Sequence, residues 1–264
     1  IRALTNYTAL LDNDENFYSV SGDGGLVLVE GATVRFTRTS FWDGRAGGRG
    51  GAIACRGGGT VILEDSPIEE NYSGAGGGGI WADDCTLTLT GTTTLARNRC
   101  WDDQFVPCAG GGLLASGGSH VSLSGPPRLF WDAHYHAMSL GNRAATGAAL
   151  LAVDAGTIVE AQDVEFSNDE ASEGSVVAAA SGAGVSILRS TLQWSDAADS
   201  LVGAAGAGSS MLLESVRFWR DSGGSLLGVS DGAHLTAAHV TADGNPGTVP
   251  SVLVEGQGSS LGLY

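Results

Sequence analysis

Two short segments of the chain gather aromatic, acidic and histidine side chains, which are the residue types used in carbohydrate and metal sites. Aromatic rings stack on the apolar faces of sugars, while carboxylates and amides hydrogen-bond to sugar hydroxyls. We therefore predict a ligand site, with carbohydrate as its candidate ligand. Its residues are Trp101, Asp102, Asp103, Gln104, Phe105, Trp131, Asp132, His134, Tyr135 and His136. The alternative is that the rings only fix their loops to the scaffold and that the polar groups are solvated.

The second segment also contains the one His-x-His pair of the chain. His134 and His136, with Asp132, are two residues apart, and alternate residues of a strand face the same side. A metal site needs three or four ligands, and no further ligand is evident in the sequence. We predict two exposed loop histidines and no metal.

Acidic pairs elsewhere in the chain do not predict an acid/base catalyst. Adjacent residues of a strand, such as Asp83 and Asp84, point to opposite faces. Polar residues at equivalent corners of successive repeats predict a stacked ladder, since short polar side chains suit turns. The alternative for such a set is a pair of carboxylates flanking a glycosidic bond. The residues expected at these corners are Asp43, Asn71, Asn98 and Asp132.

The four cysteines predict two disulfides. Cys100 and Cys108 enclose the first aromatic segment, and Cys55 and Cys85 fall near the same corner of successive repeats. An even number of cysteines in a secreted chain favours disulfide pairing. We predict Cys100–Cys108 and Cys55–Cys85. A zinc site would require Cys-x-x-Cys spacing, which is absent.

A repeated pattern of small residue, two apolar residues, glycine and a second apolar stretch determines the expected fold. Most repeats contain three apolar patches of strand length, and no segment keeps a helical period. Repeats of this length must stack to bury their apolar residues. We predict an all-β, single-stranded parallel β-helix (solenoid) of about nine coils of 25–37 residues. The repeats start at Gly25, Gly51, Gly79, Gly112, Ala149, Ser175, Ser200, Ser225 and Ser251.

The expected organisation is one solenoid domain. Residues 1–24 form an irregular segment or a partial coil, and residues 25–264 form the β-helix. Two adjacent repeats are longer than the rest, which predicts loops near 97–110 and 131–147. Both loops are expected to follow the third strand of their coil and so to lie side by side. No capping element is evident, so the partners expected at the coil ends are other protein subunits or the remainder of a longer chain.

Two repeats carry a family resemblance. Phe41-Trp-Asp-Gly-Arg-Ala46 is followed by Gly50-Gly-Ala-Ile53, and Phe166-Ser-Asn-Asp-Glu-Ala171 is followed by Gly174. These segments resemble the Phe-x-Asn/Asp-x-x-Ala and Gly-Gly-Ala-Ile signatures of polymorphic-membrane-protein repeats, with Asp43 in place of Asn. The resemblance implies an autotransporter-passenger type of surface protein, right-handed in its coiling and mostly found among bacterial adhesins. It implies an extracellular, cell-surface or periplasmic location.

The net charge of −16 excludes some partners. All 13 cationic residues are arginine, they form no basic stripe, and 29 acidic residues outnumber them. Such a surface repels nucleic acid. No apolar run is long enough to span a membrane. The glycine-rich stretches lack the Gly-Lys-Ser/Thr ending of a phosphate loop, and no cofactor is expected.

These observations predict an extracellular or cell-surface scaffold that mediates adhesion or assembly through protruding loops. One alternative is a structural component of a larger extracellular appendage or complex. A second is a polysaccharide lyase or glycoside hydrolase, although no catalytic constellation is recognisable in the sequence.

Overall fold

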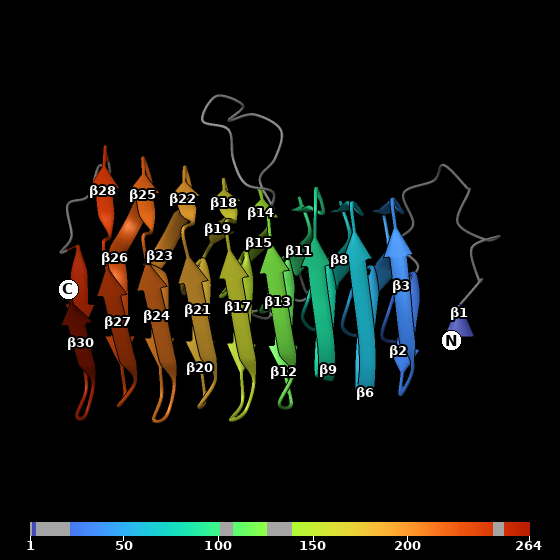
Figure 1. Ribbon diagram of the computed structural model, residues 1–264, viewed down its shortest axis with the longest axis horizontal. Coiled ribbons are helices and arrows are strands. Elements are labelled where there is room, and N and C mark those ends of the chain that lie inside the picture. The colour runs from blue at the N-terminus through green and yellow to red at the C-terminus, as the bar shows by residue number, and fades with distance from the viewer. Residues whose placement is uncertain (1, 4–21, 101–107, 126–138, 245–250) are drawn as a thin grey trace.

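The computed structural model describes residues 2–3, 22–100, 108–125, 139–244 and 251–264. These residues form strands and connecting turns and contain no helix, so the all-β prediction is confirmed. The strands lie side by side along a rod, with the blue N-terminal coils at one end and the red C-terminal coils at the other (Figure 1). No described helix is long and apolar enough to cross a membrane.

Three faces run along the rod, each built from parallel strands. The first face contains β2 (Val27–Glu30), the first parts of β6 (Ile53–Glu64) and β9 (Ile80–Thr90), β12 (Leu113–Ser116), β16 (Leu150–Val153), β20 (Val177–Ala180), the second parts of β23 (Asp196–Ala205) and β26 (Ser222–Ser230), and β29 (Val252–Val254). The second face contains β3 (Thr33–Thr37), the second parts of β6 and β9, β13 (His120–Ser124), β17 (Ile158–Gln162), β21 (Gly184–Leu188), β24 (Ser210–Glu214), β27 (His234–Ala238) and β30 (Ser260–Leu263).

The third face is a separate sheet of eight short strands. They are β4 (Phe41–Trp42), β7 (Ile68–Glu69), β10 (Leu95–Ala96), β14 (Ser139–Leu140), β18 (Glu165–Ser167), β22 (Thr191–Gln193), β25 (Arg217–Trp219) and β28 (Thr241–Asp243). A short fourth segment precedes the next coil: β5 (Arg45–Ala46), β8 (Tyr72–Ser73), β11 (Arg99–Cys100), β15 (Arg143–Ala144), β19 (Glu170–Ala171) and the starts of β23 and β26.

The chain is therefore a parallel β-helix. Eight coils have a strand on all three faces, and a ninth supplies β29 and β30. We number the coils from the N-terminus, so that coil 1 runs from β2 to β5 and coil 9 contains β29 and β30. An additional strand, β1 (Arg2–Ala3), pairs antiparallel with β2. The N-terminal edge is thus covered in part by the chain itself, which differs from the open edge that the sequence predicted.

The core is made of like residues stacked in register. On the second face Val61, Leu87 and Val121 are paired in successive coils, and all three are buried. Residues between the buried positions face outward, as the alternation of buried and exposed residues along β17 and β24 shows. This period of two is the strand signal present in the sequence. It places the outward residues of each face in continuous rows along the rod.

Both predicted disulfides are present. Cys55–Cys85 joins β6 to β9 across consecutive coils, and Cys100–Cys108 encloses residues 101–107. No described cysteine is free.

Residues 101–107 and 126–138 follow different strands of their coils, which corrects the prediction that both follow the third strand. Residues 101–107 come after β11, whereas residues 126–138 lie between β13 and β14, before the third face. The predicted loop near 131–147 contains β14 and β15. The apolar patch at 129–131 suggested the third strand of coil 4, but β14 holds that place in the eight-stranded sheet.

Candidate functional site

The ten residues of the predicted ligand site lie outside the described residues. Trp101 to Phe105 and Trp131 to His136 fall in the segments 101–107 and 126–138. The prediction for these residues, including the absence of a metal at His134 and His136, therefore stays a prediction. The described anchors of the two segments are the Cys100–Cys108 disulfide and the ends of β13 and β14.

A ladder of buried side chains lines the corner after the third face. The Oδ1 atom of Asn98 accepts hydrogen bonds from the backbone nitrogen of Asn71 (3.1 Å) and from Asn71 Nδ2 (2.9 Å). In the same way, Asn142 Oδ1 accepts hydrogen bonds from the backbone nitrogen and the Nδ2 atom of Asn98. Asp169 Oδ1 accepts the corresponding two bonds from Asn142. Each Nδ2 also donates to a carbonyl of the preceding third-face strand, as Asn98 does to Ile68 (2.9 Å). The ladder holds each coil in register with the next.

The structure corrects the membership of this ladder. Asp43 is one position too early: Gly44 occupies the equivalent place, and its backbone nitrogen donates to Asn71 Oδ1 (2.8 Å). Asp43 has a positive φ of 53° and pairs with Arg45 instead. Asp132 lies outside the described residues, and in coil 4 the ladder position belongs to Asn142. The insertion in that coil displaced the predicted position by ten residues.

Further along the same corner, Asp221 is buried and accepts two backbone hydrogen bonds. Its Oδ1 accepts from the backbone nitrogen of Ser195 (2.9 Å), and its Oδ2 from that of Trp219 (3.0 Å). Burial disfavours the charged carboxylate more strongly than these two bonds favour it, and it raises the pKa of Asp221 to about 7. Asp221 thus fixes the backbone next to two tryptophans, Trp194 and Trp219.

Trp194 and Trp219 form an aromatic pair on the outside of the rod. Their ring centroids are 4.9 Å apart and the rings are tilted by 47°. Trp219 ends β25, and its carbonyl accepts a hydrogen bond from the backbone nitrogen of Trp194 (3.2 Å). Trp194 is 36% exposed and Trp219 is half-buried. Trp194 is therefore the more exposed ring of the pair, and Trp219 is partly accessible to solvent.

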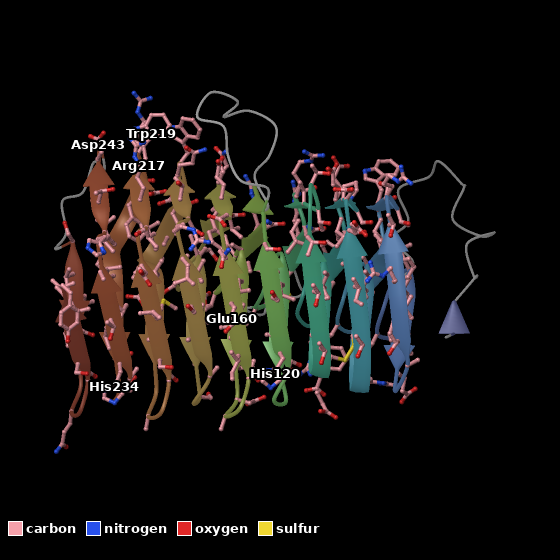
Figure 2. All side chains as sticks on the ribbon, in the orientation of Figure 1. His120, Glu160, Arg217, Trp219, His234 and Asp243 are labelled. Atoms are coloured by element: carbon pink, nitrogen blue, oxygen red, sulfur yellow. A yellow bond between two sulfur atoms is a disulfide. The ribbon has the colours of Figure 1, made fainter. Side chains whose placement is uncertain are left out.

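Two guanidinium groups lie near the Trp219 ring of this pair. The Cζ atoms of Arg220 and Arg217 lie 5.1 and 5.4 Å from the centroid of the Trp219 ring, within cation–π distance. Arg217 Nη2 is 3.6 Å from Asp243 Oδ2. Figure 2 shows Arg217, Trp219 and Asp243 together at the outer edge of coils 7 and 8. We call Trp194, Arg217, Trp219, Arg220 and Asp243 the tryptophan–arginine cluster.

Trp42 is another exposed tryptophan of the third face, at the same position of its coil as Trp219 but with different neighbouring side chains. Pairing from strand to strand places Trp42 in register with Trp219, six coils away. Trp42 is 60% exposed, and its Nε1 donates to Glu70 Oε2 (3.0 Å). Its strand neighbour is Glu69, and Arg97 pairs with both Glu69 and Glu70, so two carboxylates and one guanidinium group surround this indole. Trp42 is a natural comparison for the cluster.

A groove runs along the first face in the C-terminal half. The outward row that holds Trp81, Leu114 and Leu151 in earlier coils continues as Ala178, Gly203 and Gly228. This change to small residues leaves a groove of about 260 Å³. Its lining includes the mutually hydrogen-bonded hydroxyls of Ser175 and Ser200 and the acidic residues Asp199 and Glu255.

Within the described residues, no group of three or more His, Cys, Asp or Glu side chains is arranged to hold a metal ion. His120 and His234 are exposed on the second face, apart from the cluster (Figure 2), as expected for surface histidines. His239 is exposed as well.

Sequence reasoning missed the tryptophan–arginine cluster for a local reason. Leu192 and Trp194 are two residues apart, which in a continuous strand would place both side chains in the core. Trp194 instead has a positive φ of 51°, which ends β22 and lets the indole stay exposed while Leu192 is buried. The spacing of 25 residues between Trp194 and Trp219, one coil length, was the available signal.

Comparison with known proteins adds no relative. No family model matches the chain, and neither the curated proteins nor the solved structures contain a significant match.

Proposed function

We propose that this protein is an extracellular or cell-surface β-helix scaffold that mediates adhesion or assembly by displaying binding side chains on its outer edges. The observation that carries the proposal is the tryptophan–arginine cluster. Two indoles and two guanidinium groups on a rigid rod provide large contact area and fixed donors at low entropic cost, and such residues dominate binding surfaces.

Two further observations support the extracellular setting. The two disulfides persist in oxidising compartments, such as the outside of a cell. The repeat motifs at 41–53 and 166–174 resemble those of polymorphic membrane proteins and autotransporter passengers, whose β-helices are displayed on surfaces. The loops 101–107 and 126–138 would add to the binding surface in this proposal.

The experiment couples the whole chain to a surface and passes over it a panel of polysaccharides and extracellular-matrix proteins. Retained material and its chain length are recorded. We expect retention of at least one component without shortening. Replacement of Trp194 and Trp219 together by Ala should abolish retention, whereas Trp42→Ala should leave it unchanged. Retention that persists in the double variant would contradict the role of the cluster.

The groove on the first face favours a second candidate, a polysaccharide lyase or glycoside hydrolase. It crosses several coils and has two acidic residues, Asp199 and Glu255, in its lining. Glycoside hydrolysis uses a pair of carboxyl groups. Shortened products in the same experiment, lost in the variants Asp199→Asn and Glu255→Gln, would favour this candidate over the scaffold.

A further inference from the structure

The tryptophan–arginine cluster differs in charge from the molecule that carries it. The whole chain has a net charge of −16. Within the cluster, two guanidinium groups meet one carboxylate, that of Asp243. The neighbouring Asp221 is buried, and because burial raises its pKa to about 7 it is only partly charged at neutral pH, so the local charge stays positive. The Debye length at physiological salt is about 8 Å, so a ligand in contact with the cluster feels mainly these local groups.

Arg220 is the residue that carries the excess charge. Among the described residues, Asp243 lies near Arg217 and no acidic group forms an ion pair with Arg220. The guanidinium group of Arg220 is held against the Trp219 ring at 5.1 Å, and the residue is exposed. Its N–H groups are therefore positioned to bind a planar anion, and carboxylate is the anion that matches guanidinium with two parallel hydrogen bonds.

The indoles define the rest of the ligand. Trp194 presents part of its ring to solvent, and its ring plane is tilted by 47° from that of Trp219. The axial C–H groups of a pyranose ring form a flat apolar patch that packs on the electron-rich face of an indole. Trp219 lies between Trp194 and the Arg220 guanidinium group and is close to each of them. A sugar ring stacked on Trp194 would therefore be separated from the Arg220 guanidinium group by about the width of the Trp219 ring.

We propose that Trp194, Trp219 and Arg220 bind an acidic saccharide, one in which a pyranose ring carries a carboxylate, as in a hexuronate. This inference rests on the proposed function, since it names the ligand class of the same surface. A neutral sugar would leave the Arg220 guanidinium without an anionic partner. A long polyanion such as nucleic acid would extend beyond the cluster onto an acidic surface that repels it.

The test is a titration of the whole chain, followed by tryptophan fluorescence and calorimetry. The probes are a hexuronate trisaccharide and a neutral hexose trisaccharide of the same linkage. We expect tighter binding of the acidic probe by about tenfold or more, the effect of a charge-assisted hydrogen bond. Arg220→Gln should reduce its affinity to that of the neutral probe. Trp194→Ala should weaken both probes, and Trp42→Ala should change neither.

Four outcomes would overturn the inference. Equal affinity for the two probes, or an unchanged preference in Arg220→Gln, would remove the acidic saccharide as ligand while leaving a binding role of the indoles intact. Binding of a glutamate-rich peptide with the same affinity and the same variant pattern would assign the site to acidic peptides. No binding of either probe by the unaltered chain would reject the saccharide. The proposed scaffold function would then depend on the panel experiment alone.

Discussion

Asp169 and Asp221 are buried carboxyl groups at the corner where coils 2 to 4 hold asparagine. The ladder positions of coils 2 to 4 hold Asn71, Asn98 and Asn142, whose amides donate and accept without charge. Asp221 is only 2% exposed, and the low polarity of its surroundings raises its pKa from 3.8 to about 7. The carboxyl group is therefore partly protonated near neutral pH.

This shift makes stability depend on pH. Because the folded pKa of about 7 exceeds the unfolded value of 3.8, the folded chain keeps a proton that the unfolded chain loses between these values. The contribution of Asp221 to the free energy of unfolding is therefore largest below pH 4. It falls as pH rises from about 4 to 7, by about 4 kcal/mol, and then stays level. Asp221→Asn should remove this slope, as measured by urea unfolding between pH 4.5 and 8.

Asp163→Asn is the matched control for that measurement. The Arg189 side chain hydrogen-bonds to the carboxylate and lowers the pKa of Asp163. The contribution of Asp163 to the free energy of unfolding is therefore fully present above its unfolded pKa of 3.8 and is lost only as pH falls below that value. This loss lies outside the range of pH 4.5 to 8 used in the measurement. The control should keep the slope. A slope that persists in Asp221→Asn would show that another group causes it.

Removal of one side-chain amide from the ladder should lower the free energy of unfolding. Replacing Asn98 by Ala leaves the Asn71 backbone N–H and the Ile68 carbonyl without their side-chain partner inside the coil. Each buried group left unsatisfied costs about 1–3 kcal/mol. We expect Asn98→Ala to lower the free energy of unfolding by about 3 kcal/mol in a denaturant titration. Ser122→Ala, on the exposed second face, should change it by less than about 0.5 kcal/mol.

At the corner between the fourth segment and the first face, the backbones of successive coils lie in close contact. Gly25, Gly51, Gly78 and Gly111 occupy it in coils 1 to 4. A Cβ atom on Gly51 would overlap the carbonyl oxygen of Gly78 and lie 2.6 Å from the backbone nitrogen of Tyr72. These neighbours are backbone atoms that cannot rotate away. This corner requires glycine, because any side chain would collide with the backbone of the neighbouring coil.

Gly51→Ala should therefore destabilise the chain strongly. We expect a loss of about 3 kcal/mol or more in the free energy of unfolding, because relief of the overlap separates two coils. Gly184→Ala tests the same chemical change on the outer side of β21, where the nearest atom is Ser210 Oγ at 3.3 Å. That variant should lie within about 1 kcal/mol of the unaltered chain. Similar losses in both variants would contradict a specific role for the corner.

Elements that repeat were predictable from the sequence, and the departures from the repeat were not. Alternating residues such as Val61 and Leu63 predicted the strands, and the coil spacing predicted Cys55–Cys85. In coil 4 the insertion shifted the third strand to Ser139–Leu140, because a local apolar run cannot reveal which residues pair with the neighbouring coil. The exposed Trp194 was hidden for a related reason: its backbone conformation depends on the corner and not on its own residue type.

At the scale of the whole molecule, the disulfide between coils 2 and 3 limits the freedom of the unfolded chain. Cys55 and Cys85 are 30 residues apart in sequence. Closing a loop of this length stabilises the folded state by about 3–4 kcal/mol in the chain-entropy model. Replacing both cysteines by Ala should cost that amount in thermal or denaturant unfolding. The pair Cys100→Ala and Cys108→Ala, which opens a loop of 8 residues, should cost less.

The same bond has a mechanical consequence. Each coil contacts only its neighbours, so tension on the two ends would peel coils off one at a time. A freed coil of about 26 residues lengthens the tether by roughly 90 Å. The Cys55–Cys85 bond keeps about 30 residues from extending, so roughly 100 Å of contour would appear only after reduction. The maximum extension of the rod under tension would then depend on the redox state of its surroundings.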